Sequence, residues 1–110
     1  MDTSAQQSMN EAMDRLWAKF LPEMVERVAL IEAANRAFAE NKLSNTQRAE
    51  ANSAAHKLAG VLGTFGLTKG TVLARETELL YSGDEEPDPD LLPRLNQITQ
   101  QLKALVESRK

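Results

Sequence analysis

The segment ANSAAHKLAGVLGTFGL, residues 51–67, combines the apolar spacing of a buried helix with a glycine that can end it. Its apolar residues recur at alternating intervals of four and three, which places them on one side of an α-helix. These residues are Ala51, Ala55, Leu58, Leu62 and Phe65. Ser44, Asn45 or Thr46 can cap the start of such a helix, and Gly66 suits the left-handed conformation that ends many helices. We expect a helix over residues 46–64.

The sequence before this segment predicts two helices separated by a proline. The first 59 residues contain no glycine, and their apolar residues recur at helical spacing. Pro22 lacks a backbone N–H and suits the first turn of a helix. We therefore expect helices over residues 6–20 and 22–41. The first carries the stripe Met9, Met13, Leu16, Trp17 and Phe20.

The sequence after this segment predicts two more helices. Thr68 can cap a helix over residues 68–82, which Gly83 ends. The acidic run GDEEPDPD, residues 83–90, is typical of a connecting loop. Asp88 with Pro89, or Asp90, can then begin a helix over residues 89–108. That helix carries the clearest apolar stripe of the chain, formed by Leu92, Leu95, Ile98, Leu102 and Leu105.

These patterns predict an all-α protein. Four amphipathic helices joined by short loops bury their apolar sides most economically as an antiparallel four-helix bundle. The helix over residues 6–20 is then an additional short N-terminal helix that covers one end. A chain of 110 residues suits one domain, so we assign residues 1–110 to a single bundle.

Composition excludes several classes of function. The net charge of −3 and the lack of clustered Lys and Arg argue against nucleic acid as a partner. The chain has no cysteine, so thiol chemistry and disulfides are ruled out. The longest aliphatic run, Val28–Ile31, is far shorter than the roughly 20 residues that span a bilayer, so we expect no membrane contact and a cytoplasmic location.

His56 is the one histidine of the chain, and small residues surround it on the expected helix. Helical geometry directs it away from the apolar side, so its imidazole should face solvent. Its neighbours within two turns are Ala49, Asn52, Ser53, Ala59, Gly60 and Gly63. Glycine inside a helix costs about 0.5–1 kcal/mol relative to alanine. Either these glycines give a phosphoryl group and another protein access to His56, or Gly60 lets a neighbouring helix approach closely and Gly63 belongs to the helix end.

The segment AHKLAGVLGTFGL, residues 55–67, resembles the signature of histidine-containing phosphotransfer (HPt) domains of two-component phosphorelays. The family pattern is His-x-Leu-Lys-Gly, then a glycine and a small or aliphatic residue at the helix end, then a helix rich in Leu and Glu. His56, Leu58, Gly60, Gly66 and Leu67 match this pattern. The segment VLARETELLY, residues 72–81, is similar to the helix that follows.

The resemblance implies a phosphotransfer intermediate without kinase activity of its own. In such a relay, His56 attacks the aspartyl-phosphate of a receiver domain and later passes the phosphoryl group to the aspartate of another receiver. The implied partners are response-regulator receiver domains and, in addition, a hybrid histidine kinase. The receiver supplies Mg²⁺, so this chain is expected to need no metal or cofactor of its own.

One position departs from the family pattern. Ala59 stands where the family usually has a lysine, which is thought to offset the phosphoryl charge, although a His-x-Leu-Ala-Gly variant is known. Lys57 is the nearest cation in sequence, but it points about 100° away around the helix. Lys69 and Arg75 are further candidates.

Two other classes of function are compatible with a helical bundle. An enzyme with its own active site is disfavoured, because the sequence has no P-loop, no Gly-x-Gly-x-x-Gly motif and no Glu-x-x-His pair. We interpret Glu76 and Glu78 as solvated charges on a helix face, and likewise Glu85 and Glu86 in the loop. The stronger alternative is an HPt-like interaction bundle that binds receivers or a kinase without being phosphorylated. Trp17 and the methionines at 9, 13 and 24 are expected in the core rather than at a partner surface.

Overall fold

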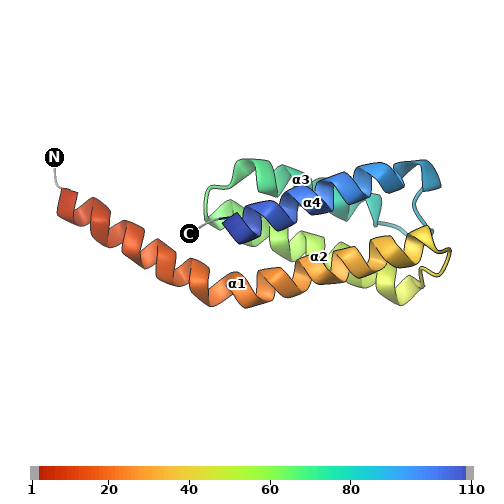
Figure 1. The fold of residues 1–110 in the computed structure, drawn as a ribbon, viewed down its shortest axis with the longest axis horizontal. Coiled ribbons are helices and arrows are strands. Elements are labelled where there is room, and N and C mark those ends of the chain that lie inside the picture. Colours follow the sequence, from red (N-terminus) through yellow and green to blue (C-terminus); the bar gives the residue numbers. More distant parts are fainter. Residues whose placement is uncertain (1–2, 109–110) are drawn as a thin grey trace.

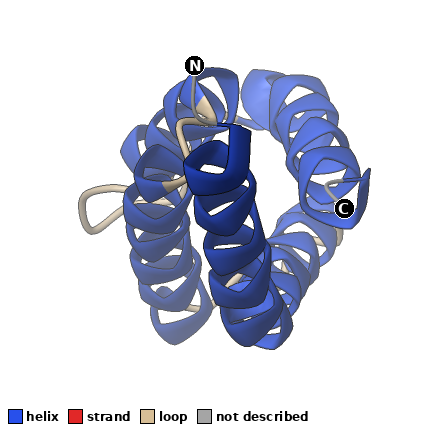
Figure 2. Cartoon of the chain, turned by 90° about the vertical axis from the view of Figure 1, so that its left-hand side faces the viewer, coloured by secondary structure: helices blue, strands red, loops and turns tan. Residues whose placement is uncertain are grey.

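The computed structural model describes residues 3–108, which form four α-helices and one short 3₁₀-helix (Figure 1). No strand occurs among these residues, so the all-α class is confirmed. The molecule measures 56 × 21 × 20 Å, and the helices surround a common core when seen along the long axis (Figure 2). In chain order the elements are α1 (Thr3–Ala39), α2 (Asn45–Thr64), α3 (Thr68–Leu80), η1 (Pro89–Leu91) and α4 (Leu92–Ser108).

Helix α1 corrects the expectation of separate helices over residues 6–20 and 22–41, because it continues through Pro22. An interior proline removes one backbone hydrogen bond and costs about 3 kcal/mol. Trp17 and Met24, on either side of Pro22, are both buried in the core, and their burial offsets this cost. α1 bends before it joins the bundle, as helices with an interior proline commonly do, and its N-terminal part projects beyond the other helices (Figure 1). The expected leading helix is therefore the N-terminal part of α1: Met9 lies exposed on the segment that projects beyond the bundle, whereas Trp17 and Phe20 near its end pack on the core.

The helix boundaries otherwise follow local signals. Ser44 is the N-cap of α2 in a capping box: its Oγ accepts a hydrogen bond from Gln47 N at 3.0 Å, and Gln47 Oε1 accepts one from Ser44 N at 3.3 Å. Gly66 and Gly83 have φ of 70° and 85°, as expected at the ends of α2 and α3. Thr68 is not a cap, because Leu67 occupies the N-cap position of α3 and Thr68 is its first helical residue.

The loop before α4 is likewise ended by a predicted signal. Asp88 Oδ1 accepts a hydrogen bond from Asp90 N at 2.9 Å, and Pro89 follows as the first residue of η1. The predicted helix over residues 89–108 is thus a 3₁₀ turn that leads directly into α4.

The core is built from one side of each helix. Ala51, Ala55, Leu58 and Leu62 of α2 are fully buried, and Phe65 lies edge-on against Trp17 with ring centroids 5.0 Å apart. The expectation of methionines in the core holds for Met24, but Met9 lies exposed on the projecting part of α1 and Met13 is partly buried. A Cβ at Gly70 would lie 3.0 Å from Leu62 Cδ1, so this glycine lets α3 pack closely on α2.

A buried polar network joins three helices at the end of the bundle where α1 and α3 end and α4 begins. Tyr81 Oη donates to Asn35 Oδ1 at 2.5 Å, and Asn35 Nδ2 donates to Thr99 Oγ1 at 2.8 Å. Burial raises the pKa of the Tyr81 phenol, because the charged form would lose its hydration. The network ties α1 and α4 to the end of α3, the helix that packs beside His56.

Candidate functional site

His56 lies in the middle of α2 and is exposed, with 67% of its side-chain surface accessible. Its buried helix neighbours Ala55, Leu58 and Ala59 hold this part of α2 against the core. The imidazole therefore stands on a rigid element and faces solvent, as helical geometry predicts.

Glu78 of α3 holds one ring nitrogen of His56. Its Oε2 lies 2.8 Å from His56 Nδ1. An ionised carboxylate can only accept a hydrogen bond, so Nδ1 carries a proton, and in the neutral imidazole Nε2 is then the nitrogen with the free lone pair. The interpretation of Glu78 as a merely solvated charge is therefore wrong: the carboxylate selects the tautomer in which Nε2 is nucleophilic.

Two hydrogen bonds from side chains of α2 to backbone oxygens at the C-terminal end of α3 explain why Glu78 reaches His56. Asn52 Nδ2 donates to the backbone oxygen of Glu78 at 2.7 Å, and Arg48 Nη1 donates to the backbone oxygen of Tyr81 at 2.8 Å. Arg48, Asn52 and His56 are spaced four residues apart and form one stripe of α2. This stripe satisfies carbonyl groups that a helix end leaves unpaired, and it sets the position of α3 along α2.

Glu76 belongs to a different interaction. Arg94 of α4 donates to it through Nε at 2.5 Å and Nη2 at 2.8 Å. The hydrogen bond from Arg94 lowers the pKa of the Glu76 carboxyl. Glu76 thus contacts α4 and Glu78 contacts α2, and they do not form a pair of catalytic carboxylates.

An open groove of about 380 Å³ runs beside His56, between α1 and α2. A Cβ at Gly60 would meet nothing within 4 Å, so no neighbouring helix approaches this glycine closely. Of the two explanations for Gly60, the structure favours access to the imidazole. The groove is lined by Phe20, Glu23, Arg27, His56, Lys57, Gly60, Val61 and Thr64.

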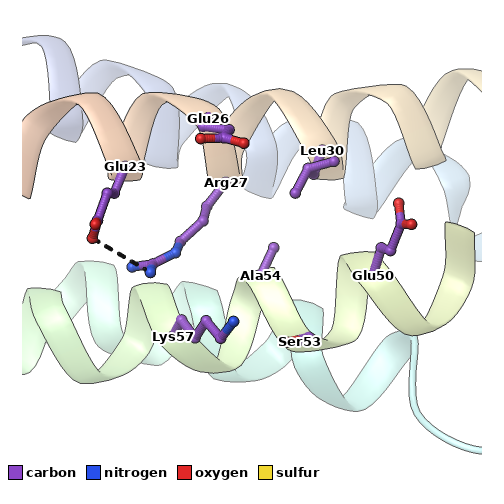
Figure 3. A pocket seen from close by; sticks show the side chains of 8 residues that line it. All are labelled: Glu23, Glu26, Arg27, Leu30, Glu50, Ser53, Ala54 and Lys57. Carbon is purple, nitrogen blue, oxygen red and sulfur yellow. Dashed lines mark ion pairs between the residues drawn. The ribbon is translucent and has the colours of Figure 1, made fainter.

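A second groove of about 350 Å³ continues along α2 in the direction of its N-terminus (Figure 3). Glu23, Arg27 and Lys57 line both grooves. Arg27 Nη2 lies 3.5 Å from Glu23 Oε2, and its guanidinium extends from α1 towards α2 (Figure 3). The other residues of this second groove are Glu26, Leu30, Glu50, Ser53 and Ala54.

Ala59 does not belong to the exposed surface around His56 as the sequence suggested, whereas Gly63 is exposed but lies beside α3. The side chain of Ala59 is buried, and Thr71 Oγ1 of α3 donates to its backbone oxygen at 3.3 Å. A Cβ at Gly63 would lie 3.5 Å from the same Thr71 Oγ1, which is an ordinary contact. Both positions face α3, because α3 packs along the side of α2 that also carries Asn52.

The structure distinguishes between the three lysine and arginine residues that the sequence offered in place of the missing family lysine. Lys57 lines the groove of His56, whereas Lys69 and Arg75 are exposed on α3 and do not line it. Arg27 lines it from α1, and sequence reasoning missed this residue. Its place opposite α2 depends on how two helices pack, which the pattern of α1 alone does not reveal.

Comparison with known families agrees with this geometry. The family described as Hpt domain matches residues 15–107, so the chain belongs to the Hpt family, the phosphotransfer domains of two-component signalling, which interact with receiver domains and kinases. Protein RcaC of Microchaete diplosiphon is 30% identical over 101 residues, which are 92% of this chain and 16% of RcaC. The chain therefore spans less than a fifth of the length of this curated relative.

No solved structure matches the chain significantly. Among residues 3–108, none of the helices has the length and apolar character needed to cross a membrane.

Proposed function

We propose that this chain is a histidine phosphotransfer intermediate that carries a phosphoryl group on Nε2 of His56 between the aspartates of receiver domains. This function is supported above all by the hydrogen bond between His56 Nδ1 and Glu78, which leaves Nε2 free on an exposed ring beside an open groove. Membership of the Hpt family supports the same reaction class.

The transfer needs no proton to move. The Nε2 lone pair attacks the phosphorus of the receiver's aspartyl-phosphate, and the N–P bond forms as the O–P bond breaks. The aspartate carboxylate leaves with the electron pair. Nδ1 keeps its proton throughout, so the phosphorylated ring carries a positive charge that the Glu78 carboxylate offsets. In the return step the ring leaves as neutral imidazole when the next receiver's aspartate attacks.

The two proteins contribute different parts of the reaction site. This chain supplies the nucleophile His56, the positioning residue Glu78 and the surface around the groove. The receiver supplies Mg²⁺ and the acidic pocket that binds it, which stabilise the negative charge on the transferring phosphoryl group. Gly60 leaves room for the receiver beside the imidazole, because its Cβ position borders only open space.

Incubation with a ³²P-labelled receiver domain tests this function. Wild-type protein should take up label that is stable to alkali and lost in acid, as expected for phosphohistidine, and His56→Gln should take up none. Addition of a second, unlabelled receiver should then withdraw the label. Receiver binding without transfer of label would refute the proposal and favour the unphosphorylated interaction bundle.

A further inference from the structure

We infer that Arg27 of α1 binds the phosphoryl group on His56 and takes the place of the lysine that position 59 lacks. This inference rests on phosphorylation of His56, as the proposed function requires. It names a residue on a different helix from the one that carries the family signature.

The position of Arg27 is the first argument. It lines the same groove as His56 and Gly60 of α2, and its guanidinium extends from α1 towards α2 (Figure 3). Only 21% of its side chain is exposed, so its stem is packed in place while its head faces the groove. A guanidinium presents a planar set of donors that matches the oxygens of a phosphoryl group.

The alternative cation, Lys57, is directed elsewhere. In Figure 3 its ammonium extends along α2 towards Ser53, whereas the guanidinium of Arg27 lies at the Glu23 end. His56 and Gly60 line the groove at the Glu23 end, and Ser53 and Glu50 line the other one. Lys57 lines both grooves, but its ammonium points towards the second one, so Arg27 is the better placed cation for a group on Nε2.

Arg27 is also able to change partners. Its contact with Glu23 is 3.5 Å long, which exceeds the roughly 2.7–2.9 Å of a charge-assisted hydrogen bond. Glu23 is 57% exposed, and ion pairs of this kind contribute little. A phosphoryl group beside His56 would carry more charge than Glu23, so Arg27 should move from the carboxylate to the phosphate. Glu23 would then compete with the phosphoryl group for the same cation.

The ionisation of the phosphoryl group measures this contact directly. Potassium phosphoramidate is the probe: its P–N bond breaks and ammonia leaves as a ring nitrogen of His56 binds the phosphorus. The charged groups that surround the product are Glu23 and Arg27 of α1, Lys57 of α2 and Glu78 of α3. A ³¹P NMR titration of the labelled protein then gives the pKa of the second phosphate ionisation, which a nearby cation lowers.

Arg27→Gln should raise this pKa by about one unit, because it removes a cation near the dianion. Arg27→Lys should restore part of the effect, and Glu23→Gln should lower the pKa by freeing Arg27. Lys57→Gln is the matched control, since it removes one positive charge from the same groove and should shift the pKa by less than half as much. Thermal unfolding followed by circular dichroism should show that all four variants remain folded.

An unchanged pKa in Arg27→Gln, or a larger shift in Lys57→Gln, would overturn the inference. Its failure is distinguishable from failure of the proposed function, because phosphoramidate labels His56 without any receiver. If the protein exchanges label with receivers but Arg27→Gln titrates like wild type, only the role of Arg27 is refuted. If phosphoramidate labels the protein and Arg27→Gln shifts the pKa but no receiver exchanges label, only the relay is refuted. If His56 takes no label at all, both are refuted.

Discussion

Replacing Glu78 by glutamine should shift the phosphorylation equilibrium of His56 towards the receiver. The glutamine amide oxygen can still accept the proton of Nδ1, so the ring keeps its orientation, but the negative charge beside the phosphorylated ring is lost. Two unit charges about 4 Å apart interact by about 1 kcal/mol in water and about 4 kcal/mol near a protein surface. The ring is 67% exposed and Glu78 only 26%, so a value near the lower end applies. A loss of about 1.4 kcal/mol corresponds to about tenfold in the equilibrium constant.

The assay mixes the protein with a phosphorylated receiver, quenches the reaction at intervals and separates the phosphorylated species by gel electrophoresis. The ratio of phosphorylated His56 protein to phosphorylated receiver at equilibrium should fall about tenfold in Glu78→Gln. In Glu78→Ala this ratio should fall further, since the substitution also removes a charge-assisted hydrogen bond, which contributes about 1.5–3 kcal/mol. The forward rate should fall in Glu78→Ala as well, because Nε2 is then no longer held as the deprotonated nitrogen.

Glu76→Gln is the matched control for this experiment. It makes the same charge change two residues away on α3, but Glu76 contacts Arg94 rather than His56. Its phosphorylation equilibrium should stay within about twofold of wild type, as expected for screened charges at a distance. If Glu78→Gln also stays within this range, or if both variants change equally, Glu78 does not stabilise the phosphorylated ring.

Substitutions at three positions test separate parts of the structure. Gly60→Ala should stabilise the protein against urea by about 0.5–1 kcal/mol, because its Cβ meets no atom, whereas Gly60→Phe should fold but slow transfer from the receiver by filling the groove. Tyr81→Phe leaves Asn35 Oδ1 without its buried donor and should cost about 1–3 kcal/mol in urea unfolding; an unchanged midpoint would contradict the network. The hydrogen bond from Arg94 lowers the pKa of the Glu76 carboxyl in the folded protein, so as the pH falls the unfolded state takes up a proton on Glu76 before the folded state does. The free energy of unfolding should therefore fall as the pH drops below about 4.3. Glu76→Gln should remove this part of the acid dependence, by less than about 1 kcal/mol for an exposed pair, and an unaltered pH profile of the unfolding midpoint would exclude it.

Local signals in the sequence were sufficient for most of the secondary structure. The capping box at Ser44 and the glycines at 66 and 83 act within one turn of chain, so their effects can be read without knowing the fold. The spacing of apolar residues in α2 also predicted which side is buried and that His56 faces outward, because both follow from 3.6 residues per turn. Pro22 misled this reasoning, since burial of residues on both sides of it depends on the other helices.

The sequence by itself determined the helices other than the continuity of α1 through Pro22, their buried sides and the histidine that carries the family signature. Only the tertiary structure decided which residues surround that histidine. Glu78 lies 22 residues from His56 and meets it because Asn52 and Arg48 hold the end of α3 at one height along α2. Arg27 reaches the same groove because α1 packs beside α2. The physical reason is that periodicity along one helix fixes which face is apolar, whereas the relative height and rotation of two helices depend on side chains from both.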